Sequence, residues 1–484
     1  MKRYFYVIIL LGFLASSCEK EFLETTPTNQ ISDQAIFQTV EGAQTVLDGI
    51  SRKMRAAGTY HDQFGVKTLD LAMDLMSEDM SISASHWFGL DHQFSNRIAS
   101  YPRTDYIWKL FYSIIYNANT IIHNIDKAKN GSTAQIANIT AQALALRAYA
   151  YFQLVQIYQH TYKGHEGSPG VPVYTQPTKE GMPRAAVSEV YERITADLEE
   201  AIRLFEAHPV TRRHISDINM SVAKGLRARV ALVMEDWETA ANRAAQARAG
   251  YPLMSFAEYS RGFDNATEQN WMWGLVINTE QSTTYGSWFS HVDWTIMGYC
   301  GAGLSRKNWS LDLHRKMNNN DNRKSLVDIS QYDPNTTKNW IIPYKFSAGN
   351  GGKGFSADYV MMRPEEMLLI EAEARARLSQ TGMAQTLLKE LRDKRYTAPV
   401  TITATGVNLI EEILLERRIE LWGEGFAALD LKRLKRGINR NNSNHLPAVA
   451  VVMTLAAEDN RWIYQIPQSE MDANPVIGME HQNP

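Results

Sequence analysis

The stretch MSVAKGLRARVALVMEDWETAANRAAQAR, residues 220–248, gives the clearest indication of the fold. Apolar and small side chains recur at helical spacing on both sides of a two-residue acidic break, Glu235–Asp236. Ala240 and Ala244, in the second half, are small enough for large side chains of the first half to pack closely against them. The stretch therefore predicts two helices joined by a tight turn.

A helix–turn–helix of this kind resembles the tetratricopeptide repeat, whose period is about 34 residues. The copies in this chain are unevenly spaced, but helical patterns extend in both directions from the stretch. Further helices are predicted over residues 36–54, 106–126, 141–158, 190–205, 363–378, 383–396, 408–425 and 426–434. The fold class that we predict is mainly α, a tetratricopeptide-like helical repeat scaffold.

The segment between residues 250 and 360 has a different texture, in which helical periodicity disappears and Gly, Asn, Ser and Trp predominate. Within it, NWMWGLVIN (270–278) alternates Trp271 and Trp273 with smaller residues, which predicts a strand whose tryptophans face the core. We therefore expect a loop-rich, partly β elaboration inserted in the helical scaffold. Loops on a rigid scaffold are where binding residues usually lie.

The composition excludes several classes of function. The 484 residues carry a net charge of -3, which offers no basic field for nucleic acid. Two cysteines, Cys18 and Cys300, cannot form a disulfide framework or a structural zinc site. The run NNNDNR (318–323) lacks the D-x-D-x-D-G pattern, so a solvated loop is expected there, with a calcium site as the alternative. No cofactor or metal site is predicted.

The carboxylates do not indicate catalysis. Glycoside hydrolysis needs two carboxylates that face each other across a cleft. The densest acidic cluster here lies on one predicted helix beside two arginines, a spacing that favours an ion-paired helix: Glu411, Glu412, Glu416 and Glu420 with Arg417 and Arg418. Neither a G-x-S-x-G elbow nor an H-E-x-x-H zinc helix is present. The sequence predicts a binding protein and not an enzyme.

The N-terminus has the order of a secretory signal peptide, with two basic residues, a short apolar run and small residues that end at Cys18. This is the arrangement of a bacterial lipobox, although Ala15 stands where Leu is commoner. We predict that residues 1–17 are removed and that Cys18 carries lipid, because several acyl chains give a durable membrane anchor. Cleavage elsewhere with loss of Cys18 is the alternative. Residues 18–30 are polar and turn-prone, as expected of a tether.

Several stretches together resemble the SusD/RagB outer-membrane lipoproteins of Bacteroidetes-type bacteria. The most recognisable is ERRIELWGEGFAALDLKRL (416–434). The others, in chain order, are TPTNQISDQAIFQTVEGAQTVLDGI (26–50), IWKLFYSIIYNANTII (107–122), ALRAYAYFQLVQIY (145–158), PGVPV (169–173), NDNR (320–323), YKF (344–346), VMMRPEEMLLIEAEARARL (360–378) and YQIPQSEMDANPVIGMEHQNP (464–484). The resemblance covers nearly the whole chain.

This resemblance implies a fold built around four tetratricopeptide-like helix pairs. It implies an N-terminal SusD-like helical domain over 31–250 and a C-terminal RagB/SusD domain over 251–484 that contains the ligand-binding insertion. The implied role is a nutrient-binding lipoprotein at the outer membrane, facing the cell exterior, that delivers ligand to a SusC-type TonB-dependent transporter. The family takes up both glycans and peptides. The alternative function is a tetratricopeptide-type assembly or scaffold lipoprotein that binds only proteins or peptides.

Aromatic rings beside polar side chains indicate where a glycan would bind, because sugars present apolar C–H faces as well as hydroxyls. Two stretches have this character, SASHWFGLDHQFSNR (83–97) and TTYGSWFSHVDWTIMGY (283–299). From them we predict a glycan ligand and the ligand-binding residues Trp87, Asn96, Tyr285, Trp288 and Trp294. The alternative is that these aromatics fill the core, which is the expectation for Trp108, Trp237 and Trp422 because they lie in helical apolar patterns.

Overall fold

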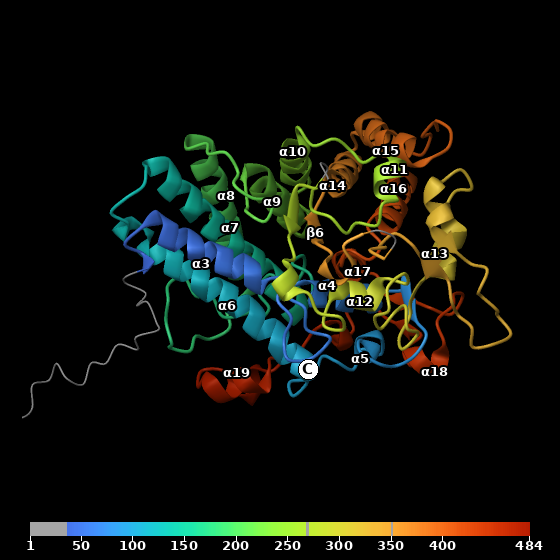
Figure 1. Ribbon diagram of the computed structural model, residues 1–484, viewed down its shortest axis with the longest axis horizontal. Coiled ribbons are helices and arrows are strands. Elements are labelled where there is room, and N and C mark those ends of the chain that lie inside the picture. The colour runs from blue at the N-terminus through green and yellow to red at the C-terminus, as the bar shows by residue number, and fades with distance from the viewer. Residues whose placement is uncertain (1–35, 268–270, 350–351) are drawn as a thin grey trace, which may run out of the picture.

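The computed structural model describes residues 36–267, 271–349 and 352–484 (Figure 1). The predicted signal peptide (1–17), Cys18 and the tether (18–30) lie outside the described residues. The principal helices are α3 (Val40–Lys53), α4 (Lys67–Leu75), α6 (Pro102–Asn124), α7 (Thr133–Tyr158), α8 (Val187–Ala207), α9 (Met220–Met234), α10 (Trp237–Arg248), α14 (Pro364–Arg377), α15 (Thr381–Arg395), α16 (Gly406–Glu420) and α17 (Ala427–Arg433). Short helices are α5 (Gly89–His92), α11 (Phe256–Tyr259), α12 (Trp288–Val292), α13 (Leu311–Lys316), α18 (Pro447–Ala450) and α19 (Gln468–Ala473).

The helix–turn–helix predicted over 220–248 is confirmed as α9 and α10. The first helix ends because Glu235 adopts a left-handed backbone conformation, with φ +60°. The Asp236 side chain then begins α10 by accepting a hydrogen bond of 3.2 Å from the backbone N–H of Thr239. Ala240 and Ala244 are buried, as their small size predicted.

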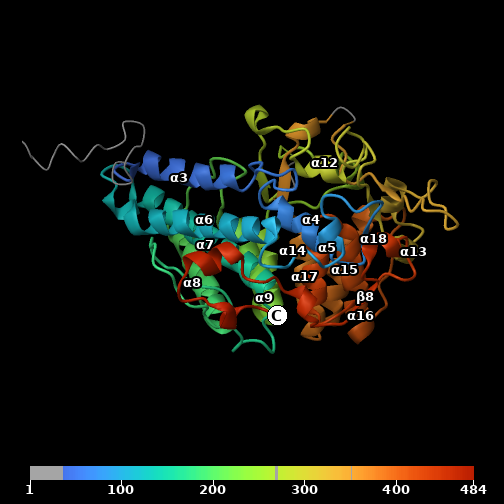
Figure 2. The ribbon, with the colours of Figure 1, turned by 90° about the horizontal axis from the view of Figure 1, so that it is seen from below.

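The helices pack in a continuous series. The helix α7 lies between α6 and α8, α8 contacts α9, α9 contacts α10, and α10 contacts α14, which also packs on α15 and α16. Figure 2 shows α3, α6 and α7 one above the other at one end of this series. The direct contact between α10 and α14 means that residues 249–363 are inserted into an unbroken helical layer. The mainly α-helical repeat scaffold is therefore confirmed.

The strands are short and form four antiparallel pairs in the described part of the chain. The pairs are β1 (Met80–Ile82) with β3 (Lys307–Trp309), β2 (Trp273–Leu275) with β6 (Tyr359–Met362), β4 (Val327–Asp328) with β5 (Ile342–Pro343), and β7 (Ile438–Asn439) with β8 (Thr454–Leu455). The strand predicted over 270–278 is confirmed in its centre.

Most tryptophans predicted to be buried are buried. Trp271, Trp273, Trp108 and Trp422 lie in the core. Trp237 is the exception, because it is only partly buried and the Arg377 guanidinium lies 5.0 Å from the centre of its ring. Trp237 is the first residue of α10, and its ring packs against the hydrophobic core as well as beneath the Arg377 guanidinium.

The larger of two hydrophobic clusters among the described residues runs through both halves of the chain, from Phe37 to Ile477, and the smaller one lies among α14, α15 and α16. The C-terminal tail also packs against α7. The backbone N–H of Tyr464 donates to the carbonyl of Ile157 at 3.0 Å, and the Asn483 side-chain amide donates to the carbonyl of Tyr158 at 2.7 Å. The domain boundary at residue 250 stays a prediction.

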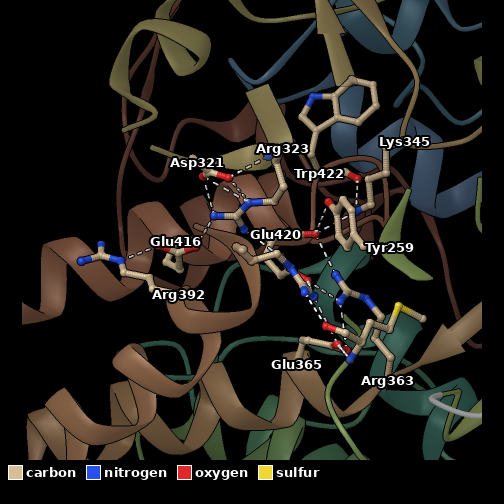
Figure 3. A network of polar contacts seen from close by, with 12 residues as sticks. Tyr259, Asp321, Arg323, Lys345, Arg363, Glu365, Arg392, Glu416, Glu420 and Trp422 are labelled. Atoms are coloured by element: carbon tan, nitrogen blue, oxygen red, sulfur yellow. Dashed lines mark hydrogen bonds and ion pairs between the residues drawn. The ribbon is translucent and has the colours of Figure 1, made fainter. Parts of the chain in front are cut away.

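A buried ion network joins the insertion to the helical layer (Figure 3). Its centre is the carboxylate of Glu420, at the end of α16. This carboxylate accepts hydrogen bonds from Arg323 at 2.7 Å, Arg363 at 2.6 Å and Arg395 at 2.8 and 2.9 Å. Burial by itself would raise the pKa of Glu420, but the three guanidinium groups outweigh it and hold that pKa well below its usual range.

Further charges surround this centre and extend the network. Asp321 binds the Arg323 guanidinium at 2.7 Å, and Glu365 binds Arg395 at 3.2 Å. Lys345 donates to the Glu424 carboxylate at 2.6 Å and to two backbone carbonyls at the end of α16. Asp321, Arg323, Lys345 and Arg363 belong to the insertion, whereas the remaining members belong to the helical layer or the loop after it.

The network corrects two predictions. The glutamates of α16 are ion-paired, but Glu416 and Glu420 pair with arginines of other elements and not along their own helix. The NNNDNR run is not a solvated loop throughout, because Asp321 and Arg323 are buried. Both differences have one cause. A guanidinium group can bind several carboxylates at once, so acidic residues that are distant in the chain can be buried around it.

Replacing Glu420 with Gln should lower the free energy of unfolding by about 3–5 kcal/mol, because it leaves buried guanidinium groups without their shared counter-charge. Urea unfolding followed by circular dichroism measures the change. The matched control is Glu411→Gln on the same helix, where an exposed pair with Arg436 is lost at a cost below about 1 kcal/mol. Equal, small effects of the two substitutions would contradict the role given to the network.

Candidate functional site

Five aromatic side chains form a partly exposed cluster that we call the aromatic platform: His61, His86, Trp87, Tyr285 and Tyr299. The His61 ring lies 6.0 Å from the Trp87 ring, 5.7 Å from the Tyr285 ring and 5.9 Å from the Tyr299 ring. His61 and His86 are exposed, Trp87 is half-buried, and Tyr285 is 43% exposed. The cluster therefore offers several ring surfaces side by side to solvent.

Buried neighbours hold the rings of the platform in place. The His61 Nδ1 lies 2.7 Å from the Tyr299 hydroxyl. Beneath them, His291 donates from Nε2 to the His61 carbonyl at 2.9 Å, and its ring stacks on Tyr299 at 4.8 Å. Burial, with a smaller contribution from Lys307, holds the pKa of His291 well below its usual range. His291 is therefore uncharged at neutral pH and supports the platform rings from beneath.

One arginine fixes two of the loops that carry the platform. Arg103, in the first turn of α6, forms buried ion pairs with Asp62 and with Asp91. Asp62 follows His61 directly, and Asp91 lies in α5, which begins two residues after Trp87. A single guanidinium thus ties the His61 loop to the Trp87 loop.

The platform contains no acidic or basic residue apart from its two histidines. The pKa of His86 lies below its usual value, because neighbouring atoms partly desolvate the exposed ring and Lys307 lies nearby. A neutral imidazole can both donate and accept a hydrogen bond. The arrangement therefore suits an uncharged ligand that has apolar faces and hydroxyl groups.

The structure brings two of the five predicted ligand-binding residues into the platform, Trp87 and Tyr285. Asn96 is fully buried, and its amide nitrogen is used by Asp91 and by the Tyr464 hydroxyl. Trp288 is only 2% exposed and packs edge-on against Phe346 at 4.5 Å. The structure therefore places neither Asn96 nor Trp288 in the platform, and their part in ligand binding stays a prediction. Both side chains are enclosed by other parts of the protein.

Trp294 lies in a separate aromatic pair. Its ring is 6.4 Å from that of Trp340, and the Arg306 guanidinium lies within 5.0 Å of both ring centres. The Trp294 indole nitrogen donates to the carbonyl of Lys307 at 2.8 Å. Among the described residues, no ring contact joins this pair to the platform, so its part in ligand binding stays a prediction.

His61 contacts three of the other platform rings but is not among the site residues predicted from the sequence. A signal was present in GTYHDQFG (58–65), where an aromatic and a histidine stand between two glycines. That loop has the same mixture of rings and polar groups as the stretches 83–97 and 283–299. Tyr299 and His86 lie within those stretches but are not among the five predicted ligand-binding residues.

No group of three or more His, Cys, Asp or Glu side chains is placed to hold a metal ion in the described part of the chain. None of the helices described is both long and apolar enough to cross a membrane.

Cys300 is buried, which raises the pKa of its thiol to about 12 and keeps it unreactive.

Comparison with known families matches two regions. A family described as "Starch-binding associating with outer membrane" matches residues 21–232, and the SusD family matches residues 290–484. SusD-like protein P38 of Formosa agariphila is 22% identical and aligns over 90% of this chain and 91% of its own length. SusD-like protein P2 of the same organism is 24% identical, over 90% and 92%.

Solved structures show the same fold. A SusD-like carbohydrate binding protein from Bacteroides vulgatus superposes with a TM-score of 0.81 at 26% identity, covering 92% of this chain and 98% of that one. A SusD superfamily protein from Bacteroides thetaiotaomicron has a TM-score of 0.78 at 24% identity, covering 92% and 100%.

The class of protein is thus a helical-repeat protein with the fold of the SusD-like carbohydrate-binding proteins. The chain belongs to the SusD/RagB family, as the sequence resemblance indicated. This is a family of carbohydrate-binding proteins that associate with the outer membrane and are generally not enzymes.

Replacing Arg103 with Met should lower the free energy of unfolding by about 3–5 kcal/mol, because Asp62 and Asp91 are left as unpaired buried carboxylates. Hydrogen exchange should also accelerate in the loops around His61 and Trp87, since both lose their shared anchor.

The control for this change is Arg52→Met, which breaks an exposed pair with Glu280 and should cost less than about 1 kcal/mol. Exchange mass spectrometry of the two variants makes the comparison. Unchanged exchange in both platform loops of the Arg103 variant would refute the anchoring role.

Proposed function

We propose that this chain is a cell-surface lipoprotein that captures oligosaccharides on the aromatic platform and delivers them to a SusC-type TonB-dependent transporter. The platform is the observation that carries the proposal. The faces of Trp87 and Tyr285 are available for stacking against the C–H faces of sugar rings. The imidazoles of His61 and His86 stand beside them and can exchange hydrogen bonds with hydroxyls. Binding alone is proposed, with no bond made or broken.

The relatives support a glycan in preference to a peptide. A structure at 26% identity is described as a carbohydrate binding protein, and a laminarin-binding SusD-like protein shares the fold with a TM-score of 0.68 at 20% identity over 92% of this chain and 98% of its own.

The anchor and the transporter complete the proposed mechanism. Cys18 carries the acyl chains, and the tether (18–30) lets the helical body reach the mouth of a transporter in the same membrane. Holding the ligand beside that mouth raises its local concentration there, as linked binding steps do.

Replacing either Trp87 or Tyr285 with Ala should weaken oligosaccharide binding by about tenfold or more, which corresponds to at least about 1.4 kcal/mol of lost stacking. Calorimetric titration with a panel of polysaccharide fragments, laminarin and starch fragments among them, measures the affinity. The control is Tyr116→Ala on α6, which removes a ring of the same 43% exposure outside the platform.

The Tyr116 variant should bind like the unaltered protein. Full affinity in both platform variants would remove the platform from the account. Saturable binding of peptides with no binding of any glycan would favour the assembly or scaffold function instead.

Replacing Cys18 with Ser should release the mature protein from the membrane fraction and abolish incorporation of labelled palmitate, because no thiol is left to acylate. Cell fractionation with immunoblotting measures both effects. Purification of the unaltered lipoprotein from native membranes should in turn bring down a large β-barrel protein. Membrane retention of the Ser variant would rule out the proposed anchor.

A further inference from the structure

A cavity of about 750 Å³ lies next to the loop that carries His61. Its walls come from the end of α3 and the loop after it, from the first half of α6, and from the start of α19. This volume is in the range of small-molecule binding sites. Tyr60, which is 47% exposed, belongs to the wall, and the ring of Tyr106 forms another part of it.

The cavity is continuous in the chain with the aromatic platform. Tyr60 lines the cavity, whereas the next residue, His61, belongs to the platform. On the platform side, Gly286, the neighbour of Tyr285, lies against the side chain of Ala57, which also lines the cavity. A single loop therefore has a platform ring on one side and the cavity on the other.

Gln63 presents an unused hydrogen-bond donor in this wall. The residue is only 6% exposed, and its Oε1 accepts from the backbone N–H groups of Thr59 at 3.1 Å and Tyr60 at 3.4 Å. Two N–H groups pointing at one atom require that atom to be the oxygen, so the amide orientation is determined. The Nε2 group then has no partner among the described residues, and Gln63 lines the cavity.

The charges in the cavity wall do not balance. Lys109 is paired with Asp105 at 2.8 Å, and Asp105 also accepts from the Ser469 hydroxyl. Lys53, in the last turn of α3, has no acidic partner in the described part of the chain, and partial burial lowers its pKa. The wall thus carries one uncompensated positive charge, whereas the platform carries no Lys, Arg, Asp or Glu.

We propose that this cavity is a second carbohydrate subsite that takes a carboxylate-bearing sugar unit, with Lys53 as its counter-charge and the Gln63 amide as a hydrogen-bond donor. The inference rests on the proposed function, because the same glycan chain would lie across the platform and pass over Tyr60 into the cavity. A ligand held at both places gains affinity from the linked second contact. The favoured ligand is accordingly an oligosaccharide that contains uronic acid.

The test is a calorimetric titration with two sets of probes of equal length, hexuronate oligosaccharides and neutral hexose oligosaccharides. The unaltered protein should bind the hexuronate set about tenfold more tightly, and added salt should reduce this preference because the charges are partly exposed. In Lys53→Gln the preference should largely disappear while affinity for the neutral set stays unchanged. Lys129→Gln, which removes an exposed lysine elsewhere, is the matched control and should keep the preference.

The outcomes separate this inference from the function on which it rests. Equal affinity for the two sets in the unaltered protein, or a preference that survives in Lys53→Gln, would overturn the inference and leave glycan binding at the platform standing. Failure of both sets to bind the unaltered protein would overturn the proposed function and the inference together. Circular dichroism confirms that Lys53→Gln is folded before its affinity is interpreted.

Discussion

The carboxylate of Glu420, buried among three guanidinium groups, is the contact on which the arrangement of this protein depends. Removing charges from water is costly, so such a cluster stabilises a fold only when every member is paired. Its members come from the insertion, from three helices and from a following loop, so it can form only when all these parts are correctly placed.

The end of α16 connects this ion network to the aromatic platform. Arg418 binds the Asp79 carboxylate and Trp422 donates to the Asp79 carbonyl at 2.8 Å, directly before β1. The partner strand β3 continues from the loop that carries Tyr299.

The platform uses the same physical device on a smaller scale. Arg103 binds two buried carboxylates and thereby joins two loops that are separate in the chain. A neutral buried histidine, His291, supports the rings from below. Rings held in place before the ligand arrives lose little conformational freedom on binding, so more of the stacking energy appears as affinity. A rigid scaffold with an ordered aromatic surface suits the ligand capture that we propose.

Much of the fold could be predicted from the sequence because helix formation leaves a local periodic pattern, as the break at Glu235–Asp236 illustrates. The site could be predicted only in part. Trp87 and Trp288 both stand among polar neighbours, yet one is at the surface and the other is buried by Phe346, which is distant in the chain. No local pattern distinguishes them.

Four of the stretches that resemble the family contain charged residues: NDNR, YKF, RPEE and ERRIELWGEG. The sequence alone does not show why charged residues stand at these positions. The structure supplies the reason, because residues from all four stretches meet around Glu420.

A crystal structure of the protein with a bound oligosaccharide, chosen from the titration panel, would show whether the platform is the glycan site. We expect a sugar ring in van der Waals contact with the faces of Trp87 and Tyr285, at about 3.5–4.0 Å between carbon atoms. We also expect hydroxyls of the same sugar to lie within hydrogen-bond distance of His61 or His86. An oligosaccharide bound at another surface while the platform stays empty would contradict the account.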